Sequence, residues 1–222
     1  GLLHAIKVAC EFRERDLAGA RVAVQGFGAV GKHAARFLAA EGAVIVAAAD
    51  RQGTVSCADG LEVEKLLALK RDGGRLMDYP YGPGVVKVDA ESIIDVPCDI
   101  WIPAARPDVL REDNVGRLQA DMFVSGANIP MTAGAEKILY DRGVLCIPDF
   151  IANAGGVICA AMEYQGASRT AAMDIIEDKL TYNVRRVLDT ARSENCMPRE
   201  AAEGIAHRRV RRAMGLRRWS LF

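Results

Sequence analysis

The sequence predicts an α/β protein with a mostly parallel sheet and a helical C-terminal part, and three observations support this prediction. Short apolar runs alternate along the chain with stretches at helical spacing. A glycine-rich turn separates the first apolar run from the helix that follows it. After residue 168 only helical spacing remains. We therefore expect a single domain over residues 1–222, with an α/β core at about 18–150 and helices at about 151–222.

The beginning of the chain predicts a helix and then a strand-turn-helix-strand unit. Apolar residues at helical spacing mark the first helix, and two short runs of valine, isoleucine and alanine mark the strands. Gly42 ends the helix between them. The unit has the length of about 30 residues that is usual for a βαβ motif. The expected elements are a helix at residues 2–12, a strand at 21–25, a helix at 29–41 and a strand at 43–49.

The middle of the chain continues this alternation, which is typical of a parallel sheet covered by helices on both faces. Glycine and proline recur through residues 71–96, so we expect a surface excursion around the strand predicted there. The expected elements are strands at residues 85–88, 99–102, 122–125 and 144–147 and helices at 61–70 and 132–141.

The C-terminal part predicts two helices. Ser168 suits an N-cap, and apolar residues recur near helical spacing from there to Ala191. Pro198 suits the first turn of a second helix over residues 199–214. The chain then ends in arginine pairs, Arg211-Arg212 and Arg217-Arg218, which we interpret as a solvated surface because no aromatic side chains interleave with them.

Composition excludes several classes of partner. Half of the residues are hydrophobic, enough for one large core, and 29 basic residues balance 29 acidic ones. A net charge of zero creates no global field for nucleic acid, and no run approaches the roughly 20 apolar residues that span a bilayer. We therefore expect neither a nucleic-acid nor a membrane partner.

The cysteines and histidines predict no metal site. The 6 cysteines are dispersed, and none of the 3 histidines has a second histidine or a cysteine at ligand spacing. The cysteine pattern is also unlike that of a secreted disulfide scaffold. We expect a reducing, cytoplasmic location.

The strongest motif is a glycine turn of the form G-x-G-x-x-G, made by Gly26, Phe27, Gly28, Ala29, Val30 and Gly31. In such a turn the first glycine permits the sharp bend, the second lets a pyrophosphate approach the backbone, and the third lets the helix pack on the strand. The motif alone is weak evidence, but here it follows a strand and opens a helix. These features predict a Rossmann-type, doubly wound fold that binds a dinucleotide.

Asp50 supports the same prediction, because it ends the second strand about 20 residues after the last glycine, where a carboxylate can bind ribose hydroxyls. A carboxylate there repels a 2′-phosphate, so we expect NAD as the cofactor. Arg51 is adjacent and could receive that phosphate, which keeps NADP possible. The alternative is a turn that serves only backbone geometry, with Asp50 as a solvated strand end.

Three later segments, at residues 97–105, 125–130 and 147–157, together with the glycine turn resemble the glutamate/leucine/phenylalanine/valine dehydrogenase family. The resemblance covers nearly the whole chain and is closest to glutamate dehydrogenases. It implies that Ala104, Ala105 and Asn128 line the nicotinamide-ribose side. It also implies that Asn153 bonds near the nicotinamide or the substrate. Asn128 could instead be a turn residue, and Asn153 a helix N-cap.

The resemblance implies reversible oxidative deamination of an L-amino acid to a 2-oxo acid and ammonia, in a homo-oligomer. It also implies that the catalytic lysine lies in an N-terminal domain that precedes this segment. We expect that domain to be absent here, so the chain alone should bind cofactor without turnover. The lysines of this chain lie in helical stretches without a sign of burial, so we assign none of them to catalysis: Lys32, Lys65, Lys70 and Lys179.

Substrate choice remains open at the sequence level. Glutamate-specific members of the family commonly carry a serine where this chain has Ala160. If residues 153–164 form a helix, then Asn153, Val157 and Ala160 share one face, and we expect them to line the substrate pocket. Ala160 could instead only permit close packing. The alternatives are a leucine, phenylalanine or valine dehydrogenase, or a non-catalytic NAD-sensing module. Malic enzymes and methylenetetrahydrofolate dehydrogenases would not account for the segment at 147–157.

Overall fold

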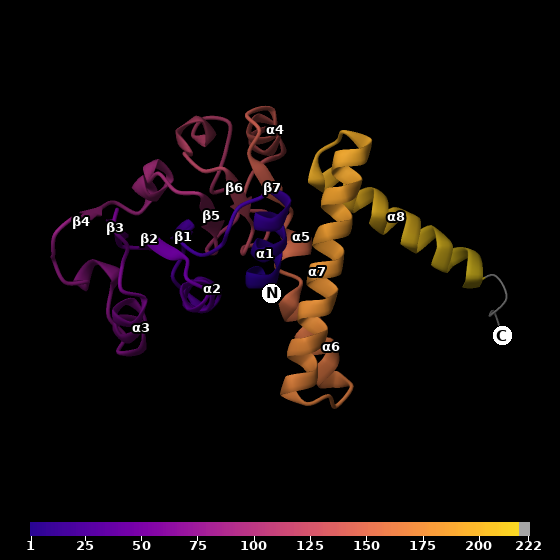
Figure 1. Ribbon diagram of the computed structural model, residues 1–222, viewed down its shortest axis with the longest axis horizontal. Helices are drawn as coiled ribbons and strands as arrows, with labels where there is room; N and C mark the ends of the chain where they lie inside the picture. Colours follow the sequence, from indigo (N-terminus) through magenta and orange to yellow (C-terminus); the bar gives the residue numbers. More distant parts are fainter. Residues whose placement is uncertain (218–222) are drawn as a thin grey trace.

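A computed structural model describes residues 1–217, in which a seven-stranded sheet lies between helices on both of its faces (Figure 1). The strand order is β4-β3-β2-β1-β5-β6-β7. Neighbouring strands from β2 to β7 in this order are parallel, whereas β3 and β4 extend one edge in antiparallel fashion. The strands are β1 (Arg21–Gln25), β2 (Val44–Asp50), β3 (Gly53–Cys57), β4 (Val85–Val88), β5 (Ile100–Pro103), β6 (Met122–Val124) and β7 (Leu145–Ile147).

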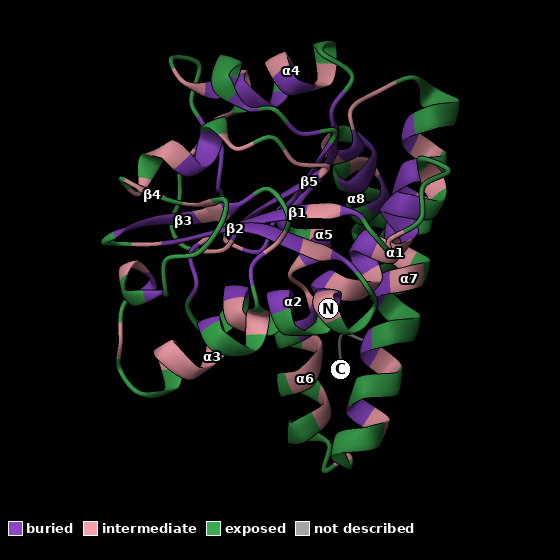
Figure 2. Ribbon diagram, turned by 60° about the vertical axis from the view of Figure 1, so that its left-hand side comes forward, coloured by how far each residue is buried: buried purple, intermediate pink, exposed green. Residues whose placement is uncertain are grey.

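The helices complete the doubly wound, Rossmann-type architecture that the sequence predicts. Alternate side chains of each buried strand point to opposite faces, so the core is split into two apolar layers. Figure 2 shows the strands buried between these layers. The α-helices are α1 (Leu2–Phe12), α2 (Ala29–Ala40), α3 (Val63–Arg71), α4 (Ala133–Asp141), α5 (Asp149–Ala152), α6 (Gly155–Tyr164), α7 (Arg169–Glu194) and α8 (Pro198–Arg217). Short 3₁₀ helices are η1 (Leu76–Asp78), η2 (Glu91–Asp95) and η3 (Val115–Arg117).

Helices α1, α2 and α3 and part of α7 cover one face of the sheet, and α4 with η2 and η3 covers the other. The second layer contains Trp101 of β5, which stacks on Phe123 of β6 with ring centroids 5.6 Å apart. Both side chains are fully buried. The two layers fix the sheet, and the carboxyl ends of its parallel strands all open at one edge, where ligands bind in such folds.

Most of the predicted elements are confirmed, with ends that differ by a few residues. Thr132 and Ser168 act as N-caps of α4 and α7, because their hydroxyls accept hydrogen bonds from Ala135 N and Ala171 N. The helix predicted at 199–214 runs from Pro198 to Arg217. Glu41 is the C-cap of α2 rather than its last residue. The starts of α4 and α7 can be predicted from the sequence because a capping side chain precedes each helix.

The prediction of a surface excursion at residues 71–96 is wrong in part. Leu76 is fully buried, Tyr79 is 5% exposed, and Ile93 and Ile94 of η2 are buried as well. This segment also follows strand β3, which the sequence analysis missed. Strand β3 pairs with β2 through a turn of two residues, Arg51 and Gln52, and its length of five residues gives little periodicity to detect.

The helix considered at residues 153–164 begins two residues later, as α6, and Asn153 lies between it and α5. Asn153 is the C-cap of α5, not the N-cap of a following helix. Its backbone closes α5 by donating to Asp149 O, while its side chain bonds to Asn128. The break between α5 and α6 thus coincides with a tertiary contact of Asn153.

The C-terminal helices pack on the core and on each other. Val187 and Ala191 of α7 meet Ala201, Ala202 and Ile205 of α8 in a small apolar cluster. Beyond this cluster α8 projects away from the sheet (Figure 1), and Arg211 and Arg212 are exposed on it, as expected for a solvated surface. Arg218 of the expected basic end lies outside the described residues. Within residues 1–217, no helix combines the length and the apolar character that crossing a bilayer requires.

Candidate functional site

The glycine turn between β1 and α2 shows three different roles for its three glycines. Gly26 has φ +97°, and a Cβ there would lie 2.6 Å from Ala105 Cβ. A Cβ on Gly31 would lie 1.9 Å from Gly26 O, whereas one on Gly28 would meet no atom within 4 Å. Two glycines therefore permit close packing, and Gly28 leaves open space at the start of α2. That arrangement fits a ligand held against the backbone.

A cavity of about 980 Å³ opens at the carboxyl ends of β1, β2 and β5. It lies where the strand order reverses between β1 and β5, which is the usual ligand position in doubly wound sheets. Its volume is at the upper end of the range for small-molecule sites. Of the predicted cofactor residues, the structure brings seven to its wall: Gly26, Phe27, Gly28, Asp50, Arg51, Ala104 and Ala105.

The remaining predicted residues lie outside the cavity wall. Ala29, Val30 and Gly31 continue the turn into α2. Val157 and Ala160 are exposed on α6, with Val157 at 76%. Their predicted roles in binding substrate stay predictions.

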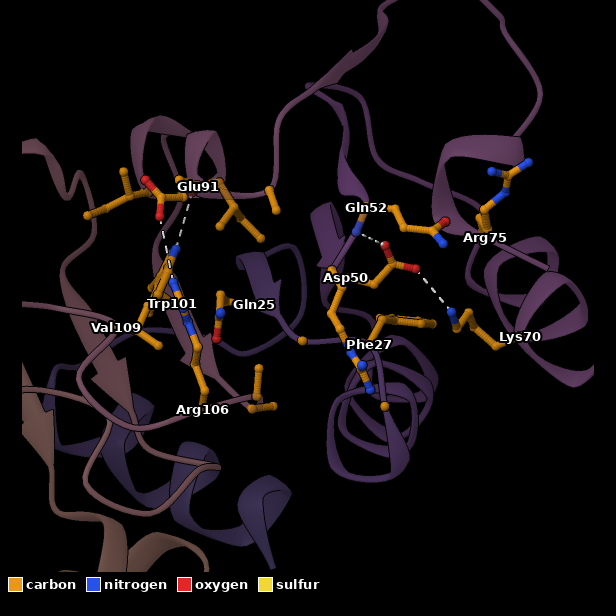
Figure 3. A pocket seen from close by; sticks show the side chains of 18 of the residues that line it. Gln25, Phe27, Asp50, Gln52, Lys70, Arg75, Glu91, Trp101, Arg106 and Val109 are labelled. Carbon is orange, nitrogen blue, oxygen red and sulfur yellow. Dashed lines mark hydrogen bonds and ion pairs between the residues drawn. The ribbon is translucent and has the colours of Figure 1, made fainter. Parts of the chain in front are cut away.

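Asp50 forms the most extensive polar contact in the cavity, shown in Figure 3. Its Oδ1 accepts a hydrogen bond from Gln52 N at 2.9 Å, and its Oδ2 accepts from Leu76 N at 3.2 Å. Lys70 of α3 reaches the same Oδ2 with its Nζ at 3.0 Å. Burial opposes ionisation of Asp50, but these hydrogen bonds outweigh it and hold the pKa of its carboxyl below the ordinary value.

The contact with Lys70 changes two expectations. Lys70 is only 25% exposed in its side chain, so the sequence analysis was wrong to see no sign of burial around it. The negative charge of Asp50, which should repel a 2′-phosphate, is already paired with a cation. A ligand that approaches Asp50 therefore meets a charge pair rather than an isolated carboxylate.

Cationic side chains surround the rest of the cavity. Arg106 reaches Glu91, with Nη2 at 3.7 Å from the carboxylate (Figure 3). Arg75 pairs with Asp78. Arg51 forms no ion pair with any residue that the structure describes. The wall carries six cationic residues, Arg51, Lys70, Arg75, Arg106, Arg111 and Arg117, and two acidic ones, Asp50 and Glu91. Five of these six cations pair with carboxylates, namely Asp50, Asp78, Glu91, Asp113 and Asp95, which leaves Arg51 to meet an anionic ligand such as a pyrophosphate.

An apolar wall faces these charges. Trp101 lies at its base, where its indole Nε1 donates to Ile93 O at 3.3 Å, and Ile94 and Val109 extend it. The sequence analysis missed Trp101 and Arg106 as cavity residues, although both stand in or beside the segment at 97–105 that it singled out. It had no signal for Lys70, which lies 20 residues from Asp50.

The loop after β6 meets the segment after β7 beside this cavity. Asn153 Nδ2 donates to Asn128 Oδ1 at 2.6 Å, which joins two residues that the sequence analysis assigned to the nicotinamide side. Behind them, Asp149 Oδ2 accepts a hydrogen bond from Ile129 N at 2.7 Å. Asn128 is exposed and Asn153 is half-buried, so both are accessible to a ligand.

An ionic cluster lies behind the Asn128–Asn153 contact. Arg199 of α8 bonds to Asp149 at 3.2 Å and to Glu136 of α4. Burial raises the pKa of the Glu136 carboxyl, and Arg199 offsets part of that rise. The sequence analysis did not find this cluster, because its three members come from distant parts of the chain. Among residues 1–217, no three or more histidine, cysteine, aspartate or glutamate side chains gather as a metal site.

Comparison with known proteins agrees with this arrangement. A family model described as Glutamate/Leucine/Phenylalanine/Valine dehydrogenase matches residues 1–218. The chain is 39% identical to a glutamate dehydrogenase of Aeropyrum pernix, over 99% of the chain and 54% of that protein. It is 37% identical to an NADP-specific glutamate dehydrogenase of Saccharolobus shibatae, over 90% of the chain and 48% of that protein. The chain thus spans about half the length of the curated relatives it matches.

Solved structures show the same similarity. A hetero-hexameric glutamate dehydrogenase from Thermus thermophilus, in its leucine-bound form, matches with a TM-score of 0.85 and 27% identity, covering 98% of this chain and 52% of that one. An L-tryptophan dehydrogenase from Nostoc punctiforme shares the fold with a TM-score of 0.76 and 23% identity, covering 96% and 58%. The glycine turn, the cavity and these matches together show that the chain belongs to the glutamate/leucine/phenylalanine/valine dehydrogenase family.

Proposed function

We propose that this chain is the dinucleotide-binding part of an NAD(P)-dependent amino-acid dehydrogenase that acts on glutamate. The reaction is the reversible oxidative deamination of an L-amino acid to a 2-oxo acid and ammonia. The observation that carries the proposal is the open space at Gly28, at the edge of a cavity of about 980 Å³ with a cationic wall. The names of the relatives support glutamate as the substrate.

The residues of this chain bind and orient the cofactor, which supplies the site that accepts or donates hydride. Helix α2 begins at Ala29 after Gly28, without an acidic residue in its first turn. Its unpaired N–H groups and the positive end of its dipole favour the pyrophosphate. Ala104 and Ala105, both in the cavity wall, leave room for a flat ring and ribose beside the backbone.

Either form of the cofactor suits the cavity. Asp50 offers a carboxylate to ribose hydroxyls, as NAD requires, and its Oδ1 accepts only one hydrogen bond, from Gln52 N. Lys70 pairs with Asp50, and Arg51 and Arg75 stand close enough to line the same wall, which suits the 2′-phosphate of NADP. We propose NAD as the preferred cofactor with NADP as a competent second one.

The whole enzyme needs more than this chain. We propose that the catalytic lysine and the cations that hold the substrate carboxylate come from a preceding domain, and that the enzyme is a cytoplasmic homo-oligomer. Asn153, Val157 and Ala160 remain our proposed substrate contacts. Because Ala160 offers no hydrogen-bond donor, an aliphatic amino acid is the second candidate substrate.

A matched pair of glycine variants tests cofactor binding by this chain. Gly28 has φ −88°, and a methyl group there would enter open space. For Gly28→Ala we therefore expect an unchanged unfolding free energy but at least tenfold weaker NADH binding, measured by calorimetry. Gly31→Ala must displace Gly26 O, so it should lower stability as well. Equal NADH affinity in wild type and Gly28→Ala would exclude the glycine turn from the binding site.

Turnover tests the assignment as an enzyme. The chain alone should bind NADH without oxidising glutamate or leucine, and the full-length protein should turn over glutamate. Activity of the chain by itself would contradict the assignment of the catalytic lysine to another domain. A full-length protein that binds NADH and oxidises no amino acid would instead favour the NAD-sensing module.

A further inference from the structure

Asp149 is a buried carboxylate at a strand end that touches no part of the cavity wall. It lies two residues after the end of β7, and its side chain is 9% exposed. Both of its oxygens are occupied, Oδ2 by Ile129 N at 2.7 Å and Oδ1 by Arg199 Nη2 at 3.2 Å. A buried charge with this many contacts is costly unless each contact is kept. The role of Asp149 is therefore to be sought in the two groups that it binds, the Ile129 backbone and the Arg199 guanidinium.

The first of those groups is the backbone of the loop after β6. Ile129 has φ +50°, a left-handed conformation that is strained for a β-branched residue. Its side chain is 63% exposed, so packing around the side chain does little to stabilise this conformation. Two hydrogen bonds to its backbone hold the residue instead. Ile129 N donates to the Asp149 carboxylate, and Ile129 O accepts from Asp108 N at 2.9 Å.

The left-handed residue lies immediately after Asn128. Ile129 N is part of the peptide that joins it to Asn128, so the bond to Asp149 also restrains the backbone of Asn128, whose Oδ1 meets Asn153 Nδ2. Asp149 also accepts Asn153 N through its backbone carbonyl. One residue thus fixes both members of the Asn128–Asn153 pair.

The second group is the guanidinium of Arg199, in the first turn of α8. Arg199 also bonds to Glu136, which is 4% exposed, so one cation compensates two buried carboxylates. Burial disfavours the charge of Arg199, but hydrogen bonds and charges from Glu136 and Asp149 outweigh it and raise the Arg199 pKa. The pairing ties the helical C-terminal part to the loop that carries Asn128.

We propose that Asp149 is a positioning residue for the nicotinamide end of the site, acting through the Ile129 backbone on Asn128 and secured by Arg199. The inference rests on the proposed function. It goes further by assigning a role to a residue that touches neither cofactor nor substrate. It predicts that a change at Asp149 weakens binding of the nicotinamide half of the dinucleotide and spares the adenosine half.

The test compares NADH with ADP-ribose, which lacks the nicotinamide ring, on the wild-type chain and on Asp149→Asn. An amide has a single acceptor oxygen, so it can satisfy Ile129 N or Arg199 but not both. We expect the dissociation constant of the variant for NADH to rise at least tenfold and that for ADP-ribose to change less than twofold. Asp141→Asn is the matched control, since Asp141 pairs only with Lys137 on the surface.

A second variant separates positioning from general damage. Asparagine tolerates the left-handed region better than isoleucine does. Adding Ile129→Asn to Asp149→Asn should therefore restore at least threefold of the lost NADH affinity, and Ile129→Asn alone should change little. If Asp149→Asn does not fold, Asp149→Glu replaces it, because it keeps the charge near Arg199 while displacing the acceptor.

The affinities for NADH and ADP-ribose either support or overturn the role of Asp149. Selective loss of NADH affinity with rescue supports the inference. Equal loss for both ligands, or no loss for either, overturns it while leaving the proposed function standing. A folded wild-type chain that binds neither NADH nor ADP-ribose overturns the proposed function itself.

Discussion

The two ends of the candidate site, at Asp50 and at Asp149, share one arrangement of charges and hydrogen bonds. At one end Asp50 closes β2, accepts an N–H from the distant residue Leu76 and pairs with Lys70. At the other end Asp149 follows β7, accepts an N–H from Ile129 and pairs with Arg199. In each case a carboxylate at a strand end holds a loop by its backbone, and a cation from a helix neutralises it.

The difference between the ends lies in what the carboxylate faces. Asp50 lines the cavity and can itself meet a ribose, whereas Asp149 lies behind a loop and reaches the site only through Asn128. The same charge pair is thus part of the binding surface at one end and a support for it at the other. A substitution should therefore change cofactor choice at Asp50 and loop geometry at Asp149.

The largest expected effect contrasts the two carboxylates in stability. Asp149→Ala removes the acceptor of Ile129 N and of Arg199 Nη2, while Arg199 keeps its pair with Glu136, so we expect a loss of about 3 kcal/mol of unfolding free energy. Asp50→Ala leaves Lys70 closer to solvent and should cost about 1–2 kcal/mol. Urea unfolding measures both, and an equal loss would break the comparison.

Cofactor choice gives the next effect. Replacing Lys70 by methionine leaves the charge of Asp50 uncompensated, so the affinity ratio of NAD to NADP should rise about tenfold, about 1.4 kcal/mol. Asp50→Ser should move the ratio the opposite way. Lys65→Met is the matched control on the same helix, because Lys65 pairs with the exposed Glu62. A ratio that stays constant in the Lys70 variant would transfer discrimination to Arg51.

The pH dependence of stability should have opposite signs at the two ends. The pKa of Asp50 is lowered from 3.8, so its contribution is present above that pH and is lost as the pH falls through the lowered pKa. The pKa of Glu136 is raised from 4.5, so its contribution is largest below that pH and is lost as the pH rises through the raised pKa.

Two amide variants separate these contributions. Asp50→Asn should flatten the fall of unfolding free energy below pH 3.8, and Glu136→Gln should flatten its fall above pH 4.5. Denaturant unfolding, measured at intervals of about half a pH unit between pH 3 and pH 7, gives the slope of unfolding free energy against pH for each variant. If the two substitutions changed the slope of unfolding free energy against pH in the same direction, the ionic groups would not be arranged as described.

The smallest expected effect concerns substrate choice. Ala160 is exposed on α6, outside the cavity wall, and a serine there adds a hydroxyl without a steric conflict. In the full-length protein Ala160→Ser should raise kcat/KM for glutamate relative to leucine by a few fold, about 1 kcal/mol. An unchanged ratio would remove Ala160 from the substrate site.

Much of the fold and one end of the site follow from local sequence. The glycine turn, its flanking strand and helix, and Asp50 lie within one βαβ unit, so their spacing alone brings them together. The N-caps Thr132 and Ser168 mark helix starts because capping depends on neighbouring backbone groups. The helices and strands predicted from such short-range geometry are confirmed, whereas the binding roles of Asp50 and the glycine turn stay predictions.

The other end of the site was decided by tertiary structure. Lys70 reaches Asp50 only because β3 and η1 turn the chain back, and Arg199 reaches Asp149 from 50 residues away. Asn153 ends a helix instead of starting one, and its side chain bonds to Asn128, 25 residues away. A charged or amide side chain leaves no periodic pattern in the sequence that would identify its partner. The partner depends on how distant segments pack across the sheet. The sequence by itself therefore determined the Rossmann-type core and the glycine turn, while the charge pairs and the loop that carries Asn128 depended on contacts between segments that only the folded chain brings together.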